Sequence, residues 1–283
     1  MNIMHPEKYR LVALDMDGTL LNTDHETSAY TREVIDRVAQ SGKIAAISTG
    51  RCLSELWEHF KKMPGIRYVI CENGACVYDI WEKKTIYRIA LPHEQVMKVM
   101  DIADGFDLTI QFFKDGQSCM QCTDIENLKN YHIYDFAGVF EASAIFVGDL
   151  RACYLENPGS IGKFNLYCAS EKDKYAAQKI IETEIPEAIL SDSIGVGLEV
   201  SPANATKGNG LRKLCEHLGI TVEESIAVGD SSNDIDIIRT AGLSVAMGNA
   251  IQEVKDLADV ITEDCDHDGA AKAIQRYMLG ENV

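Results

Sequence analysis

The chain has 283 residues, of which 46% are hydrophobic and 25% charged, and its formal net charge is -17. This length predicts a sizeable core and favours two domains over one, and the acidic balance argues against nucleic-acid binding, which depends largely on basic patches. No signal-peptide core opens the sequence, and no stretch reaches the 18 or so apolar residues of a membrane span. We therefore expect a cytoplasmic protein without a membrane or nucleic-acid partner.

The first predicted element is a buried strand over Leu11–Leu14 that ends at two carboxylates, Asp15 and Asp17, followed by Gly18 and Thr19. In open α/β sheets, ligands bind just past the carboxyl ends of the strands, which is where these carboxylates would lie. A carboxylate in this position can attack phosphorus to form an aspartyl-phosphate, and a second acid can move the protons. The alternative interpretation is an ordinary acidic turn that ends a strand.

The next two elements are a helix over Thr27–Gln40 and a second apolar strand over Lys43–Ile47. This strand is followed by a hydroxyl group, a glycine and a cation, at Thr49, Gly50 and Arg51. Such a group at a strand end can hold a phosphate with its side-chain hydroxyl and backbone N–H. A plain turn with a solvated arginine is the competing interpretation.

A helix to about Met63 and a strand over Tyr68–Cys71 come next, and the strand leads into the turn residues Asn73 and Gly74. An Asn-Gly pair is a strong hairpin signal, so we expect residues 76–78 and 85–89 to pair as antiparallel strands. Asn73 is either a site residue or only a turn residue.

The middle third of the chain shows no further strand ending in carboxylates. It alternates predicted helices and strands, and we interpret it as a separate α+β domain inserted into the first, with hinges near Ile89 and Ile194. The predicted elements are helices at 92–103 and 173–184, and strands at 108–113, 117–122, 144–147 and 163–168.

The nine cysteines are scattered through apolar stretches, which favours reduced core thiols over a disulfide framework. Cys119 and Cys122 are the one close pair. Without a second pair or nearby histidines, they are a weak signal for zinc.

The last third of the chain returns to strands that end in polar residues. Lys207 precedes a helix at about 209–218, where it either contacts a phosphate or is an ordinary surface lysine. A strand at 225–228 ends at Asp230, and Asn233 and Asp234 follow at the start of a helix. Carboxylates gathered at one sheet edge raise each other's pKa unless a cation neutralises them, and oxygen ligands favour Mg²⁺. Strands at 243–247 and 260–262 and helices at 251–257 and 269–277 complete the pattern.

Four of these stretches together resemble the motifs of the haloacid dehalogenase superfamily: Asp15 to Thr19, Thr49 to Arg51, Lys207 with Gly208, and Gly229 to Asp234. The large insert between the second and third motifs is similar to that of the Cof-type phosphatases with a type IIB cap. The resemblance implies a Rossmann-like α/β core, with a parallel sheet and helices on both faces, formed by residues 1–88 and 195–283. Residues 89–194 would form the inserted α+β cap that selects the substrate.

The resemblance also implies roles for individual residues. Asp15 would attack the phosphoryl group, Asp17 would act as acid and base, and Lys207 would bridge the nucleophile and the phosphate. The remaining expected site residues are those that bind phosphate or substrate (Thr49, Gly50, Arg51 and Asn73) and those that bind or order Mg²⁺ (Asp15, Asp17, Asp230, Asn233 and Asp234).

The expected activity is hydrolysis of small phosphorylated metabolites, such as sugar phosphates, by a Mg²⁺-dependent phosphatase. A phosphomutase of the same superfamily is one alternative, because it uses the same two aspartates. A non-catalytic protein that binds a phosphometabolite is another, although it would have no chemical need of Asp17. A P-loop nucleotidase is disfavoured because its glycine-lysine run is absent from the sequence.

Overall fold

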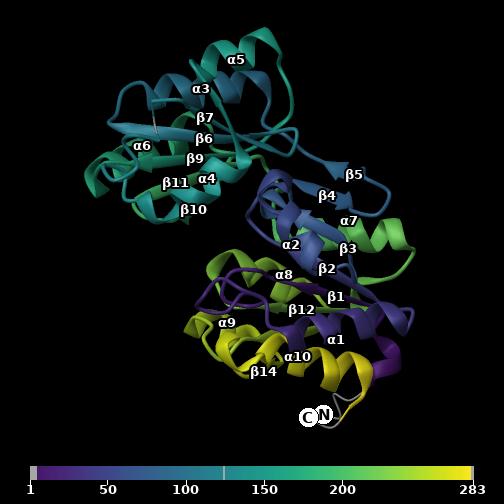
Figure 1. Cartoon of the computed structure of the whole chain (residues 1–283). Coiled ribbons are helices and arrows are strands. Elements are labelled where there is room, and N and C mark those ends of the chain that lie inside the picture. The colour runs from purple at the N-terminus through teal and green to yellow at the C-terminus, as the bar shows by residue number, and fades with distance from the viewer. Residues whose placement is uncertain (1–4, 124, 282–283) are drawn as a thin grey trace. The chain divides into compact units, whose positions relative to one another are not determined.

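The computed structural model describes residues 5–123 and 125–281 (Figure 1). The chain forms two compact units. Unit 1 comprises Met1–Gly50, Trp57–Tyr87 and Thr206–Val283, and unit 2 comprises Arg51–Leu56 and Arg88–Ala205. No helix within the described ranges is both long and apolar enough to cross a membrane.

Unit 1 is built on an eight-stranded sheet whose central strands are parallel, which confirms the expected α/β core. The strands predicted after the Asn-Gly turn, β4 and β5, are neighbours in the sheet, and β4 also runs antiparallel to β3. The strands lie in the order β14 (Val260–Ile261), β13 (Leu243–Ala246), β12 (Ser225–Gly229), β1 (Leu11–Leu14), β2 (Ile44–Ser48), β3 (Ile66–Cys71), β4 (Cys76–Asp79) and β5 (Lys84–Arg88).

Helices cover both faces of this sheet, with α1 and α10 on one side of β1 and β12 and α8 on the other (Figure 1). In α1, Val34, Ile35 and Val38 are buried, and the Ser28 hydroxyl caps the first turn by accepting from the Thr31 N–H. The helices of unit 1 are α1 (Ala29–Gln40), α2 (Trp57–Lys62), α7 (Lys207–Leu218), α8 (Ile235–Thr240), α9 (Gln252–Leu257) and α10 (Gly269–Ala273), which a π-helical turn extends over Ile274–Leu279.

Unit 2 contains a six-stranded sheet that is antiparallel except for the pairing of β7 with β8. Its main core joins residues of α3, α5 and α6 to the sheet, including Val99, Tyr154, Ile181, Phe112 and Phe164. The strands lie in the order β10 (Ile189–Ser193), β11 (Gly197–Ser201), β9 (Ile161–Cys168), β6 (Leu108–Lys114), β7 (Gln117–Gln121) and β8 (Ala144–Val147). The helices are α3 (His93–Ala103), α4 (Ala137–Ser143), α5 (Leu150–Glu156) and α6 (Glu171–Glu184).

The observed units differ from the predicted boundaries in two places. Strand β11 lies beyond the expected hinge at Ile194, yet it pairs with β9 and β10 and so belongs to unit 2. The segment Arg51–Leu56 also groups with unit 2, because the Ser54 N–H donates to the Gly116 carbonyl at 3.0 Å and the Ser54 hydroxyl accepts from the Ser118 N–H at 3.1 Å. The hydrogen bonds of Ser54 could not be predicted from the sequence, because the segment Arg51–Leu56 directly follows the second strand of unit 1 in the chain.

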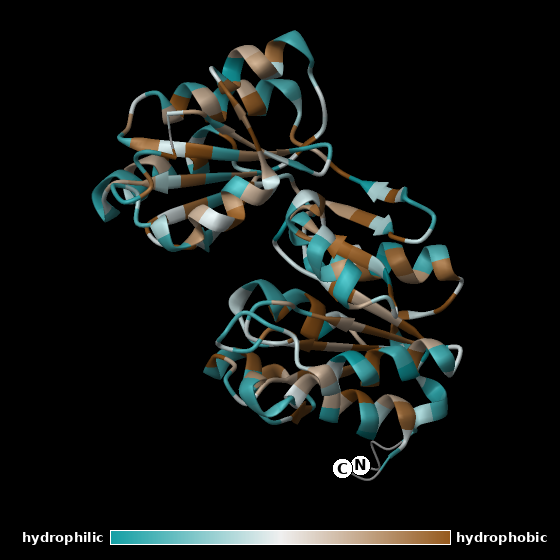
Figure 2. Cartoon of the chain, viewed as in Figure 1, coloured by the Kyte–Doolittle hydropathy of each residue, from teal (hydrophilic) through white to brown (hydrophobic). Residues whose placement is uncertain are grey.

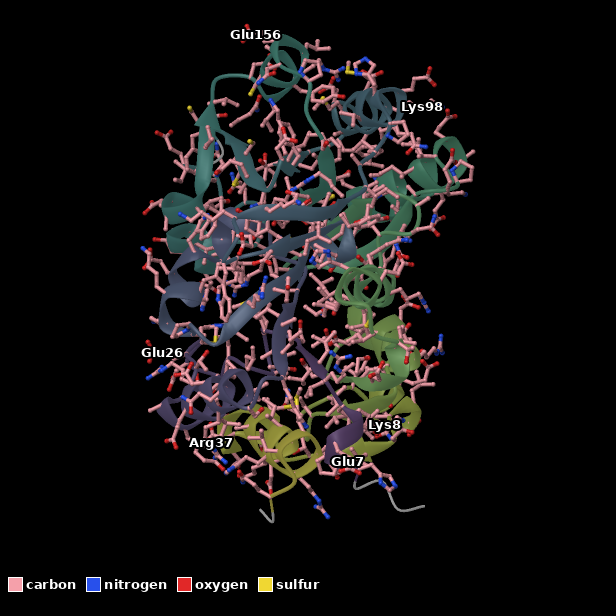
Figure 3. The ribbon with its side chains drawn as sticks, turned by 90° about the vertical axis from the view of Figure 1, so that its right-hand side faces the viewer. Glu7, Lys8, Glu26, Arg37, Lys98 and Glu156 are labelled. Carbon is pink, nitrogen blue, oxygen red and sulfur yellow. The ribbon has the colours of Figure 1, made fainter. Side chains whose placement is uncertain are left out.

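Many of the charged side chains lie on the surface of the protein. Hydrophobic residues run along the strands in Figure 2, whereas hydrophilic residues mark the outer sides of the helices. In Figure 3, Glu7, Lys98 and Glu156 lie at the periphery with their side chains pointing away from the ribbon. Exposed charges of this kind contribute little to stability, so the informative charges are the few that are buried.

Candidate active site

The candidate site lies where neighbouring parallel strands of unit 1 end. Asp15 follows β1, and its N–H donates to the carbonyl of Val228 in β12 at 3.0 Å. Asp230 follows β12 directly. Because Leu14 and Val228 are register partners, Asp15 and Asp230 emerge side by side at the carboxyl edge of the sheet.

Lys207 joins two buried carboxylates at this edge. It is the first residue of α7, whose N-terminus is capped by the Thr206 hydroxyl. Its Nζ donates to Asp15 Oδ1 and to Asp234 Oδ1, both at 2.6 Å. Lys207 is 1% exposed, and Asp15 and Asp234 are 5% and 0% exposed. Burying a charge is costly unless it is paired, so this arrangement fixes the position of the Lys207 ammonium firmly.

Asp234 uses both of its oxygens inside the protein. Its Oδ2 accepts from the N–H groups of Asp230 at 2.9 Å and Ser231 at 3.0 Å, while Oδ1 accepts from Lys207. Asn233, the neighbouring residue, accepts from the Ser231 hydroxyl at 2.9 Å. Asp234 therefore ties the Asp230 loop to Lys207.

The loop after β1 holds Asp230 in place through two residues that have no role among the predicted site residues, Gly18 and Thr19. The Thr19 hydroxyl donates to Asp230 Oδ1 at 2.8 Å. Gly18 has φ +78°, and a Cβ there would lie 2.6 Å from Asp230 Oδ2, so the close approach requires glycine. The sequence signal for Gly18 and Thr19 is their position in the stretch from Asp15 to Thr19. Asp17 is exposed in the same loop.

A turn after β3 brings two further predicted residues together. The Asn73 N–H donates to the Thr49 carbonyl at 3.1 Å, and its Oδ1 accepts from Asn233 Nδ2 at 3.3 Å. Gly74, with φ +95°, allows this turn to approach the start of α7, since a Cβ there would lie 2.0 Å from the Thr206 carbonyl oxygen. Arg51, unlike the other predicted site residues, groups with unit 2.

The electrostatics of the cluster follow from burial and from an excess of carboxylates. Burial raises the pKa of Asp15 well above its usual range, and Asp234 and Asp230 raise it further, whereas Lys207 lowers it. Burial raises the pKa of Asp230 to about 6, against the hydrogen bond from Thr19. For Lys207, burial lowers the pKa, but Asp15 and Asp234 outweigh it and the net shift is upward.

The donor set fits a divalent cation. Asp15, Asp230 and Asp234 each offer a carboxylate oxygen, and these oxygens lie within 4.8 Å of one another. Three carboxylates face one ammonium, so a cation there would relieve the repulsion that raises the pKa of Asp15. Oxygen-only ligands favour a hard cation.

Comparison with known proteins identifies the family of this chain. The family model described as haloacid dehalogenase-like hydrolase matches residues 12–274. The 5-amino-6-(5-phospho-D-ribitylamino)uracil phosphatase YcsE of Bacillus subtilis is 31% identical over 278 residues, which cover 95% of this chain and 96% of that protein.

Two solved structures share the fold. A haloacid dehalogenase-like hydrolase from Bacteroides thetaiotaomicron has a TM-score of 0.83 and 26% identity, over 95% of this chain and 99% of that one. The subclass IIB sugar phosphatase BT4131 has a TM-score of 0.78 and 23% identity, over 95% of this chain and 98% of that one. The chain therefore belongs to the haloacid dehalogenase-like hydrolases, and the prediction of a phosphatase of this superfamily with a IIB-type fold is confirmed.

Proposed function

We propose that this haloacid dehalogenase-like hydrolase is a Mg²⁺-dependent phosphatase that hydrolyses small phosphorylated metabolites through an aspartyl-phosphate on Asp15. The observation that carries the proposal is the buried Lys207 ammonium, held at 2.6 Å from both Asp15 and Asp234 at the carboxyl edge of the sheet. A cation fixed beside a carboxylate that follows a central strand is suited to a phosphoryl group, because it stabilises negative charge that develops during transfer.

In the first step, a carboxylate oxygen of Asp15 forms a bond to phosphorus as the bond to the leaving oxygen breaks. Asp17, two residues further along the loop, gives its proton to that leaving oxygen. Water then attacks phosphorus, Asp17 takes up the proton, and the bond between Asp15 and phosphorus breaks. Lys207 holds the carboxylate and a phosphoryl oxygen in place throughout, with Thr49 and the Gly50 N–H as further phosphate contacts.

The proposed metal ligands are Asp15, the main-chain carbonyl of Asp17, and Asp230. When bound, Mg²⁺ would neutralise the carboxylates and a share of the phosphate charge. Because both oxygens of Asp234 already accept hydrogen bonds, we assign to it the orientation of Lys207 and of the Asp230 loop. Asn233 would order the water molecules that surround the metal.

Unit 2 is the proposed substrate-selecting cap. The curated relative YcsE is named for a phosphorylated ribityl compound, which supports a small phosphorylated metabolite as the substrate class. Arg51 and Asn73 are the proposed substrate contacts outside the phosphate cradle.

Phosphate release from a panel of phosphorylated metabolites, with and without Mg²⁺, tests the proposal. We expect Mg²⁺-dependent turnover that is lost in Asp15→Asn and Asp17→Asn and retained in Asp24→Asn, an exposed carboxylate in the same unit. Isomerisation that depends on a bisphosphate activator would instead identify a phosphomutase. Binding without turnover of any phosphorylated metabolite would identify a non-catalytic binding protein.

A further inference from the structure

A second cluster of side chains that could hold a metal ion lies in unit 1, outside the carboxylates described above. Cys71, Glu72 and Cys76 each offer a ligand atom, and these atoms lie within 4.8 Å of one another. All three side chains are 0% exposed. The proposed phosphatase reaction uses none of them.

The hairpin between β3 and β4 brings these residues together. Cys71 ends β3 and Cys76 begins β4, and the two are direct partners in the antiparallel register. Side chains of directly opposed residues lie on the same face of the sheet, which places the two thiols side by side.

The turn that joins the strands has an unusual backbone. Glu72 and Asn73 have φ values of +55° and +54°, and Gly74 follows with +95°. Two consecutive non-glycine residues rarely adopt this left-handed conformation. The turn is held by bonds from the Ala75 N–H to the Glu72 carbonyl and from the Asn73 N–H to the Thr49 carbonyl, both at 3.1 Å. The Glu72 carboxylate thus lies beside the thiols and away from solvent.

We propose that Cys71, Glu72 and Cys76 bind a thiophilic divalent cation such as Zn²⁺. Zn²⁺ takes thiolate and carboxylate ligands in tetrahedral sites, and three protein ligands leave one position for water. Binding converts two thiols to thiolates and releases two protons, so the two positive charges of the cation offset the two thiolates, and the buried carboxylate leaves the occupied site with one negative charge. The ligands differ in kind from the oxygen-only set around Asp15, which favours a hard cation.

Such a site would fasten the turn that carries Asn73. Both ends of the turn and its first residue would be bound to one ion, and the Asn73 N–H and side chain would stay aligned with Thr49 and Asn233. Binding at this place is independent of the proposed reaction, so its test needs no turnover.

The test is a titration of the full-length, reduced and chelator-stripped protein with Co²⁺, in excess Mg²⁺ to occupy oxygen sites. We expect one equivalent of Co²⁺ to give thiolate-to-metal charge-transfer absorption, which oxygen ligands do not produce. Zn²⁺ should displace the Co²⁺ and abolish the absorption. Asp230→Asn should leave the absorption unchanged, which separates this site from the carboxylate cluster.

Variants of the ligands sharpen the test. Cys71→Ser and Cys76→Ser should each weaken Co²⁺ binding and reduce the absorption, while Cys168→Ser, which alters a buried thiol of unit 2, should change neither. Glu72→Gln should keep the absorption but weaken Co²⁺ affinity by about tenfold or more, since loss of a mere outer-shell partner already costs about that much. Unchanged Co²⁺ affinity in Glu72→Gln would show that the Glu72 carboxylate is not a ligand of the metal.

The wild-type protein provides a measurement that does not depend on the folding of variants. Because a cation that binds only the folded state stabilises it, Zn²⁺ should raise the midpoint of thermal unfolding in the presence of excess Mg²⁺. No thiolate absorption with Co²⁺ and no shift with Zn²⁺ would overturn the proposal.

Discussion

The Nζ of Lys207 lies 2.6 Å from Asp15 Oδ1, although the two residues are 192 positions apart in the sequence. The contact joins the end of the central strand β1 to the first residue of α7, and Asp234 completes it from a third segment. A buried ammonium between two carboxylates cannot be removed without leaving uncompensated charge. The geometry of the proposed nucleophile and the stability of unit 1 are therefore linked.

The first prediction is that Lys207→Met lowers both activity and stability. Loss of one fixed cation at the transferring group should reduce kcat by about 100-fold or more. The unpaired carboxylates should lower the free energy of unfolding by about 3–5 kcal/mol. Phosphate release and urea unfolding measure the two effects.

Lys213→Met on the same helix is the matched control. Lys213 pairs with Glu216 three residues away, and that carboxylate is mainly exposed, so the change should cost less than about 1 kcal/mol. Equal effects of the two substitutions would contradict the special role of Lys207.

A second prediction compares two glycines of positive φ. Gly74→Ala should be strongly destabilising and should impair phosphate release, because a Cβ there would lie 2.0 Å from the carbonyl oxygen of Thr206, next to Lys207. Gly42 has φ +77° but no atom within 4 Å of its Cβ position. Gly42→Ala should therefore show only backbone strain, about 1–2 kcal/mol, with unchanged kcat. Thermal unfolding and kcat of both variants decide the matter, and a similar loss in both would show that the contact with Thr206 is unimportant.

The motifs predicted which residues form the site better than they predicted how those residues contact one another. Carboxylates after apolar strands placed Asp15 and Asp230 at one sheet edge, because parallel strands end together. The burial of Lys207 could not be predicted, since a single lysine at a loop is normally solvated and the two carboxylates that bury it come from distant segments. Nor could the sequence show that both carboxylate oxygens of Asp234 accept hydrogen bonds from within the protein.

The same contrast holds for the fold. Apolar runs and helical spacing predicted the strands and helices of unit 1 to within a few residues. Strand β10 was not predicted, because Ser191 and Asp192 break its apolar pattern. Its pairing with β11 across a turn at Gly195 forms the strand. The grouping of Arg51 with unit 2 likewise depends on tertiary contacts rather than local pattern.

The third prediction concerns pH and Mg²⁺. Burial raises the pKa of Asp15 above its usual range and that of Asp230 to about 6, so a cation competes with protons for these carboxylates at higher pH than it would for ordinary aspartates. Mg²⁺ binding should release protons, and its apparent affinity should fall as the pH is lowered through about 6. Calorimetric titrations in buffers of different ionisation enthalpy measure both quantities. An affinity that stays constant between pH 5 and 8 would contradict the prediction.

A fourth prediction concerns acid stability. Burial raises the pKa of Asp79, but hydrogen bonds from Arg67 and from the N–H groups of Glu82 and Trp81 outweigh it, and the net shift is downward. A lowered pKa in the folded state stabilises the protein above the ordinary aspartate pKa of 3.8, and this contribution is lost as the pH falls through the folded value. Asp79→Asn should cost about 1–3 kcal/mol at pH 7.

That cost should shrink towards acid pH, as measured by urea unfolding between pH 7 and pH 3. Glu82→Gln, at an exposed carboxylate of the same turn, should cost little at any pH. A cost for Asp79→Asn that does not depend on pH would show that its charge is not what matters.

The order of the strands has a consequence for biosynthesis. One neighbour of β1 in the sheet is β2, but the other is β12, and their register joins Leu11 to Ser225. Every residue of unit 2 leaves the ribosome before β12 does. We therefore expect unit 2 to complete its folding first. Until β12 is synthesised, the edge of β1 that pairs with it stays unpaired on the nascent chain. An unpaired strand edge is prone to aggregation, so protection of the N-terminal segment during translation should raise the yield of this protein.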